Sequence, residues 1–242
     1  MEVVFLCLIM VISFLYSSVG HGGASGYLAL MAIYGIEILL MRPSALMLNI
    51  FVSSIAFMAF YKGGHFRFKL LLPFIITSIP MSFLGASLNI NSIVYEIILS
   101  ICLVIAVFRM IYIVREKYKI TKPTPLWAGL LTGAILGFVS GLIGIGGGII
   151  LSPVLILFRW ATLKEAAAVS ALFILLNSVS GLFGLYASGL LYYNTQLILL
   201  VLVALAGGLA GSYAGSFKFQ HVRLKYILAL VLLIASIKIM TT

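Results

Sequence analysis

The sequence predicts an all-α polytopic membrane protein made of two inverted repeats, with about 8–10 membrane segments. Three observations lead to this fold class. The 242 residues are 64% hydrophobic and only 8% charged, whereas soluble domains are about 45–50% apolar and about 25% charged. The apolar residues are grouped in long runs, and a glycine-rich segment occurs once in each half. So few charges cannot cover a water-facing surface, which excludes a soluble enzyme, a disordered chain and a collagen-like rod.

The charge balance and the cysteines exclude several other classes. A net charge of +10 would indicate nucleic acid in a soluble protein, but in a membrane chain it marks cytoplasmic loops. Cys7 and Cys102 lie inside apolar runs, so they predict neither a disulfide framework nor a metal site. No cofactor motif is present. Glu2 and the absence of a basic residue before the first apolar run predict a retained membrane segment and not a signal peptide.

Two copies of one unit account for the glycine-rich segments. FLYSSVGHGGASGYLA at residues 14–29 aligns with FVSGLIGIGGGIILSP at residues 138–153, at an offset of 124. The same offset places Ser53-Ser54 on Asn177-Ser178, and short slips then align residues 83–85 with 209–211 and residues 105–109 with 234–238. We therefore expect a first repeat at residues 1–110, a polar linker at 111–126 and a second repeat at 127–242.

Each unit divides into five apolar segments. They run over residues 3–19, 26–41, 44–61, 69–88 and 92–114, and then over 126–144, 148–159, 164–187, 194–217 and 223–242. A full span needs about 20 residues, so the first two segments of each unit are short. We expect each of these pairs to form half-helices or short tilted helices that meet at a glycine break within the membrane.

The positions of the cations determine the predicted topology. If all segments count toward sidedness, as crossings or as re-entrant pairs, thirteen of the fifteen Lys and Arg share one face. If each broken pair is one crossing, the split is nine against six. The positive-inside rule favours the first count, with the linker cytoplasmic, both termini outside and Arg42 and Lys238 on the outer face. The shared face holds Lys62, Arg67, Lys69, Arg109, Arg115, Lys117, Lys119, Lys122, Arg159, Lys164, Lys218, Arg223 and Lys225.

Equivalent loops of the two units also differ in charge. The loop with Lys62, Arg67 and Lys69 corresponds to residues 187–194, which carry no charge, and uncharged residues 89–92 correspond to a loop with three cations. An odd number of crossings per unit inverts the second copy, and loops of opposite character are what inversion predicts. Inverted repeats with broken helices are a transporter architecture.

The glycine breaks are the predicted substrate site. Glycine permits the turn and lets a ligand approach the backbone, and the helix that starts after each break presents free N–H groups and a positive dipole end that favour an anion. Asparagine and serine side chains in the third helix of each unit would complete the shell; the alternative for them is hydrogen bonding between helices. The predicted residues are Gly20, His21, Gly22, Gly23, Ala24, Ser25, Asn49, Ser53, Gly144, Ile145, Gly146, Gly147, Gly148, Ile149, Asn177 and Ser178.

Other features have structural or competing explanations. His21 could bind substrate or carry a coupled proton, but Ile145 replaces it in the second copy, which favours a structural, hydrogen-bonded histidine. Glycines at every fourth position predict close helix packing. They are Gly129, Gly133, Gly137 and Gly141, followed by Gly207, Gly211 and Gly215.

The Gly-Ala-Ser-Gly segment at residues 23–26 matches the nucleophile motif of rhomboid intramembrane proteases. An intramembrane serine hydrolase using Ser25 and His21 is therefore the alternative function. The second copy lacks this serine, and the other histidines, His65 and His221, lie in charged loops. Mutation of Ser25 to Ala would abolish an enzyme's activity but only weaken a carrier.

The glycine run at residues 144–148 followed by Pro153, its weaker copy at residues 20–23, and the length of about 240 residues resemble the TauE/SafE family of sulfite exporters and anion permeases. The resemblance implies transport of sulfite, thiosulfate, sulfoacetate or a similar anion. His21, and Ala29 in place of a proline, depart from the family pattern.

We thus expect a secondary transporter in the inner cell membrane, not an enzyme, working by alternating access around the two broken helices. Without a nucleotide-binding motif, the energy source would be an ion or substrate gradient. The expected partners are the lipid bilayer and a small anion, and not nucleic acid. A coupled proton or other ion, a homo-oligomer, and a binding subunit without flux are left open.

Overall fold

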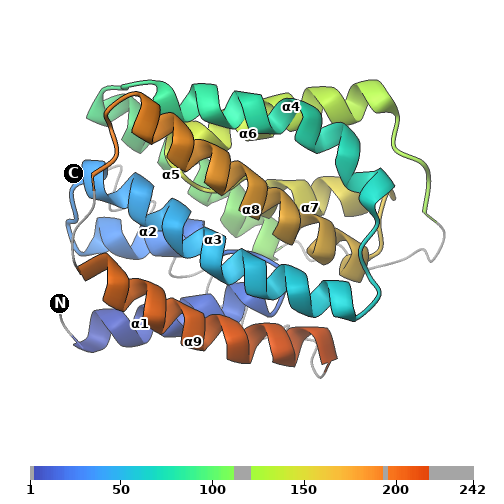
Figure 1. The fold of residues 1–242 in the computed structure, drawn as a ribbon, viewed down its shortest axis with the longest axis horizontal. Coiled ribbons are helices and arrows are strands. Elements are labelled where there is room, and N and C mark those ends of the chain that lie inside the picture. The colour runs from blue at the N-terminus through green and yellow to red at the C-terminus, as the bar shows by residue number, and fades with distance from the viewer. Residues whose placement is uncertain (1–2, 112–120, 193–195, 218–242) are drawn as a thin grey trace.

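The computed structural model describes residues 3–111, 121–192 and 196–217, and these residues are helical apart from the loops between the helices (Figure 1). Helices α3, α4, α6, α8 and α9 are long and apolar enough to cross a membrane, whereas α1, α2 and α7 are shorter. The predicted segment at 223–242, the linker cations at 115–119 and all cations after residue 217 lie outside the described residues. The helices are α1 (Val3–Ser17), α2 (Ala24–Ile33), α3 (Ile38–Lys62), α4 (Phe68–Ser87), α5 (Ser92–Ile111), α6 (Leu126–Ile143), α7 (Gly148–Leu157), α8 (Leu163–Ala187) and α9 (Gln196–Phe217).

Glycine stripes hold helices from the two halves close together. A Cβ added at Gly141 of α6 would overlap the Ser82 carbonyl of α4, and a Cβ at Gly211 of α9 would overlap the Phe14 carbonyl of α1. The prediction that the four-residue glycine spacing serves helix packing is therefore confirmed. Helix α4 runs beside α6, α1 runs beside α9, and α3 packs against α8.

The two broken helix pairs start from opposite ends of the molecule. In the first pair, the rings of Phe5 in α1 and Tyr34 after α2 lie 4.8 Å apart, so the pair returns to the end at which it began. In the second pair, the Lys122 N–H before α6 donates to the Arg159 carbonyl after α7 at 2.7 Å. Figure 1 shows the first pair starting at the left and the second at the right.

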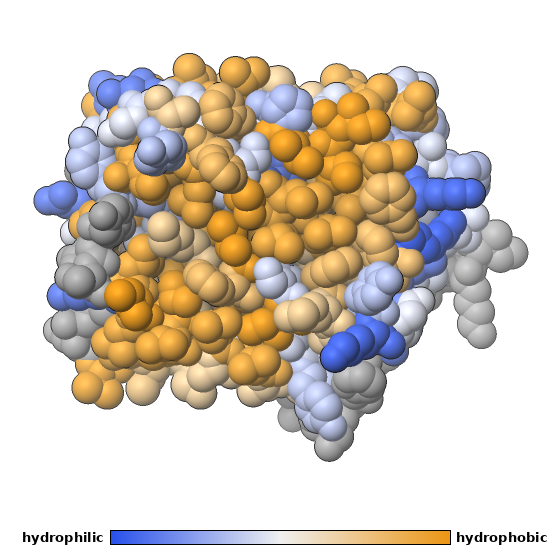
Figure 2. Space-filling model, viewed as in Figure 1, coloured by the Kyte–Doolittle hydropathy of each residue, from blue (hydrophilic) through white to orange (hydrophobic). Residues whose placement is uncertain are grey.

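One end of the molecule carries most of the described cations. Arg67 in the α3–α4 loop donates to Glu165 at 3.2 Å and to Thr121 at 3.3 Å, which joins that loop to the start of α8 and to the residues before α6. We call this the cationic end. Figure 2 shows apolar side chains over the middle of the visible face and hydrophilic ones at both ends, as expected for a lipid-facing surface. The loops of the cationic end carry Lys62, Arg67, Lys69, Lys122, Arg159 and Lys164.

The predicted boundary between the second and third segments is wrong. The sequence placed it at residues 42–43, but α2 ends at Ile33, the chain turns at Gly35 with φ 68°, and α3 begins at Ile38. Pro43 lies in the second turn of α3, where the missing N–H removes only one bond near the helix start. Arg42 is consequently part of a helix and only 7% exposed.

Candidate functional site

The two glycine breaks are buried inside the helical bundle. Gly23 before α2 has φ 98° and Gly147 before α7 has φ 72°, a left-handed conformation that glycine adopts without steric cost. Residues 20–25 and 144–149 are all buried. The N–H groups of the first turn of each short helix have no partner within that helix. The positive dipole ends of α2 and α7 therefore point into the interior.

Asn49 of α3 connects the two breaks. Its side-chain Oδ1 accepts a hydrogen bond from the Ala24 N–H at 3.1 Å, and its Nδ2 donates to the Ile145 carbonyl at 3.2 Å. Asn49 is fully buried. A Cβ at Gly22 or Gly146 would overlap the Asn49 amide, so glycine is needed where the breaks approach it. One side chain thus holds the start of α2 and the second break at the same place.

Helix α8 closes the site from the other side. Ile174 is the neighbour of Gly22, Gly146 and Gly148, and a Cβ at Gly146 would lie 3.3 Å from the hydroxyl of Ser178. The Ser178 hydroxyl is buried and has no hydrogen-bond partner within the described part of the chain, and the same holds for Ser140 of α6, whose Cβ lies beside Gly147. A buried hydroxyl left unsatisfied costs about 1–3 kcal/mol. These two groups can satisfy a polar ligand at the second break.

Ser53 and Asn177 are placed differently from each other. Ser53 lies one turn after Asn49 on α3, is fully buried, and its hydroxyl has no partner among the described residues. Asn177 donates instead to Ser78 at 3.1 Å and to the Phe173 carbonyl at 2.8 Å, at the contact between α8 and α4. The side-chain donors of Asn177 are therefore used for helix packing, and only its side-chain oxygen Oδ1 lacks a partner among the described residues.

His21 joins the first break to the second repeat. Its Nδ1 lies 2.8 Å from the Val19 carbonyl, which can only accept, so Nδ1 carries a proton. Its Nε2 lies 3.1 Å from the hydroxyl of Ser152 in α7, and that hydroxyl lies 2.7 Å from the one of Ser170 in α8. His21 is hydrogen-bonded through both ring nitrogens, as expected, and its role in substrate or proton binding stays a prediction. If Nε2 gains a proton, the direction of the serine hydrogen bonds must reverse.

The geometry does not support the hydrolase alternative. The hydroxyl of Ser25 lies 2.6 Å from the hydroxyl of Tyr16. The ring nitrogens of His21 have other partners: Nδ1 bonds to the Val19 carbonyl and Nε2 to the hydroxyl of Ser152. A serine nucleophile requires a base at hydrogen-bond distance, and neither nitrogen of His21 serves Ser25. The hydroxyl of Ser25 instead anchors the first turn of α2 to α1.

Each break also rests on the start of a long helix from the other half. Gly20 packs against Ala167 in the first turns of α8, and Gly144 packs against the backbone of Arg42 in α3. Sequence reasoning did not find Ser140, Ser152, Ile174 or Tyr16, because only the three-dimensional arrangement brings them to the breaks. The sequence did single out Arg42, since it was one of two cations predicted to lie on the face opposite all the others.

Comparison with known proteins agrees with this architecture. The family model described as sulfite exporter TauE/SafE matches residues 5–239. A protein described as a probable membrane transporter from Sinorhizobium fredii is 38% identical over 234 residues, which cover 95% of this chain and 94% of that protein. A second probable membrane transporter, from Methanocaldococcus jannaschii, is 34% identical over 110 residues, covering 44% of this chain and 41% of its own length. No solved structure matches the chain. The chain is a multi-pass membrane transporter and not an enzyme, and it belongs to the sulfite exporter TauE/SafE family.

Proposed function

We propose that the chain is a secondary transporter of a small anion, a sulfur oxyanion or organosulfonate such as sulfite, thiosulfate or sulfoacetate. The anion binds where the starts of α2 and α7 meet, and the protein works by alternating access around the two breaks. The family membership supports the substrate class, because its model describes sulfite exporters. The energy comes from an ion or substrate gradient, and His21 is the candidate carrier of a coupled proton.

The observation that carries this proposal is the position of Asn49. Its Oδ1 already accepts from the N–H of Ala24 at a helix start, which is the place an oxygen of a bound anion would take. An incoming anion displaces Oδ1, and a rotated amide then presents Nδ2 to the anion in place of the Ile145 carbonyl. Asn49 therefore acts both as a latch between the breaks and as a ligand.

Neutral donors complete the proposed site. The hydroxyls of Ser53, Ser140 and Ser178 are buried without partners among the described residues. The N–H groups of Gly20, His21, Gly144 and Gly148 already donate to backbone carbonyls, and the other N–H groups of residues 20–25 and 144–149 are the proposed backbone donors. Asn177 is the weakest member of the shell, because its two donor bonds are already made. A site without a fixed cation suits a substrate that must also leave.

Inverted repeats explain how such a site alternates. We propose repeats at residues 1–110 and 127–242, joined by a cytoplasmic linker at 111–126, with both termini outside the inner membrane. The two hairpins that start from opposite ends support this arrangement, as do the described cations gathered at one end. Movement of α1–α2 would open the breaks toward the outer end, and movement of α6–α7 would open them toward the cationic end.

Transport into proteoliposomes tests the proposal. Purified protein is reconstituted, and saturable uptake is measured for sulfite, thiosulfate, sulfoacetate, phosphate and chloride, with protein-free vesicles as the control. We expect saturable flux for at least one sulfur anion and competition among anions that share the site. Absence of saturable flux for every anion would refute the transporter. Binding without flux would favour a binding subunit.

A further inference from the structure

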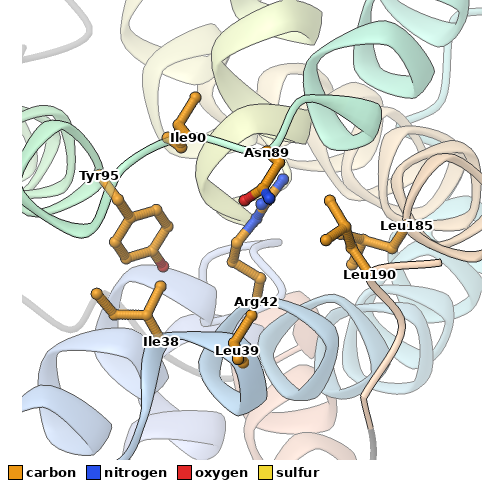
Figure 3. A pocket seen from close by; sticks show the side chains of 8 residues that line it. All are labelled: Ile38, Leu39, Arg42, Asn89, Ile90, Tyr95, Leu185 and Leu190. Carbon is orange, nitrogen blue, oxygen red and sulfur yellow. The ribbon is translucent and has the colours of Figure 1, made fainter. Parts of the chain in front are cut away.

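A pocket around Arg42 lies at the end of the molecule opposite the cationic end. It is lined by Ile38, Leu39, Arg42, Asn89, Ile90, Tyr95, Leu185 and Leu190, and its cavity volume is about 30 Å³. Figure 3 shows Arg42 rising between Tyr95 and the two leucines, with its guanidinium beneath Asn89. The pocket leads from the exposed Asn89 down to Arg42, which is 7% exposed.

Arg42 has no counter-ion within the described part of the chain, and its guanidinium donates to backbone carbonyls. Nη2 donates to the carbonyls of Ala86 at 3.0 Å and Gly141 at 3.4 Å, in the last turns of α4 and α6, and Nη1 donates to the carbonyl of Leu88 at 3.5 Å. The negative dipole ends of these helices offset part of the charge. Nε is buried and has no partner among the described residues, and the single ion pair among them joins Arg67 to Glu165, at the other end.

Two residues that line the pocket also contact the second glycine break. The backbone of Arg42 packs against Gly144, 3.2 Å from the position of a Cβ there, and the hydroxyl of Tyr95 donates to the carbonyl of Ile143 at 3.1 Å. The pocket and the second break are therefore joined through Arg42 and Tyr95. A buried cation beside a cavity in a membrane protein often marks an ion or substrate path.

We propose that the Arg42 pocket is a second anion-binding site, a vestibule that loads or releases a small oxyanion between the outer end and the breaks. The ligands are the guanidinium of Arg42 and the side-chain amide of Asn89. Ile38, Leu185 and Leu190 form the apolar wall of the site. This inference rests on the proposed anion transport, but it assigns a site that the breaks do not include.

Thiol protection at Leu39 tests the site without measuring transport. In a background with Cys7→Ser and Cys102→Ala, Leu39→Cys, at an exposed residue that lines the pocket but is not a ligand, is labelled with a water-soluble maleimide, with and without sulfoacetate, which does not react with maleimide. We expect the anion to slow labelling at least threefold, and Arg42→Gln to abolish the protection. The matched control is Ser188→Cys, an exposed position at the same end that does not line the pocket, and its labelling should not respond. Unchanged labelling of Leu39→Cys would overturn the site.

Transport kinetics test the same site through the KM at each end of the molecule. Loss of a charge-assisted bond weakens binding about tenfold to a hundredfold, so Arg42→Gln should raise KM by that factor for anion presented at the outer end. KM at the cationic end should not change, and Arg42→Lys should restore part of the loss. An equal fall in maximal rate from both ends would show that Arg42 only caps α4 and α6, and would overturn the proposal.

The two measurements separate the inferences. Protection without flux would retain the Arg42 site and refute the transporter, whereas flux without protection would do the reverse. A lipid phosphate is the other source of the same chemistry. Labelling in detergent is therefore repeated with phosphatidylglycerol alone, and protection by this lipid but not by sulfoacetate would overturn the assignment to transported anions.

Discussion

Asn49 offers the sharpest test of how the glycine breaks work. Replacement by alanine removes the hydrogen bonds at 3.1 and 3.2 Å and leaves the Ala24 N–H and the Ile145 carbonyl buried without a partner. Each orphaned group costs about 1–3 kcal/mol, so the free energy of unfolding should fall by about 2–6 kcal/mol. Replacement by aspartate keeps the acceptor at the start of α2, where a negative charge is favoured, and should cost less stability.

Transport should rank the same two variants in the opposite order. The carboxylate of Asn49→Asp occupies the place of the anion and repels it, so we expect transport to fall at least a hundredfold. Asn49→Ala keeps the helix starts free and should lose less transport per folded molecule. Stability is measured as the melting temperature by size-exclusion chromatography. Transport is measured as anion uptake in proteoliposomes at pH 8, where the carboxylate at a helix start is ionised.

A variant at the α4–α8 contact serves as the control for Asn49. Ser82→Ala removes one buried bond, to the carbonyl of Asn177 at 2.8 Å, at the α4–α8 contact away from the breaks. It should lower stability by about 1 kcal/mol and leave transport per folded molecule unchanged. If transport instead follows stability, with Asn49→Ala worse than Asn49→Asp, Asn49 only supports the fold and the ligand role is refuted.

Three further predictions concern packing, topology and pH. Gly141→Ala places a Cβ against the Ser82 carbonyl and should cost about 1–3 kcal/mol. Gly181→Ala, which meets only the flexible end of Leu46 at 3.2 Å, should keep its melting temperature, and equal melting of the two variants would contradict the packing role. Single cysteines at Lys62 and Ser188 should be labelled from opposite sides of the membrane, and labelling from one side would exclude inverted repeats. Burial and the Lys164 ammonium hold the pKa of His65 below 6.5, so the folded state binds fewer protons than the unfolded chain. Stability should therefore decrease as pH falls below 6.5, and His65→Gln should flatten the melting profile; an unchanged slope in that variant would rule the histidine out.

The sequence predicted the parts of the fold that depend on local pattern. Apolar length gave the long helices, glycine runs located both breaks, and the four-residue spacing of Gly207, Gly211 and Gly215 predicted a packed face. These features depend on residues that are close in the chain. The loop charges also predicted which loops share an end, since Arg67 and Glu165 meet there.

The contacts at the site depend on distant segments and were less predictable. The repeat alignment places Phe173, and not an amide, opposite Asn49, so no internal symmetry indicated that one asparagine would hold both breaks. The sequence left Arg42 and Pro43 between two apolar segments, although a proline in the second turn costs α3 only one bond. Ser178 was predicted from the sequence, whereas Ser140 became a candidate for the same shell only through the folded arrangement.

The exchange of partners between the halves has a consequence for biosynthesis. Helix α1 has its main helical neighbour in α9, and α4 has its main neighbour in α6. When residues 1–110 have left the ribosome, neither of these helices has the partner that its carbonyls contact. The helices of the first half therefore remain loosely associated in the bilayer until their partners are inserted, and α9 supplies the partner of α1. Quality-control proteases should therefore remove truncated chains that end before α9 more readily than full-length protein.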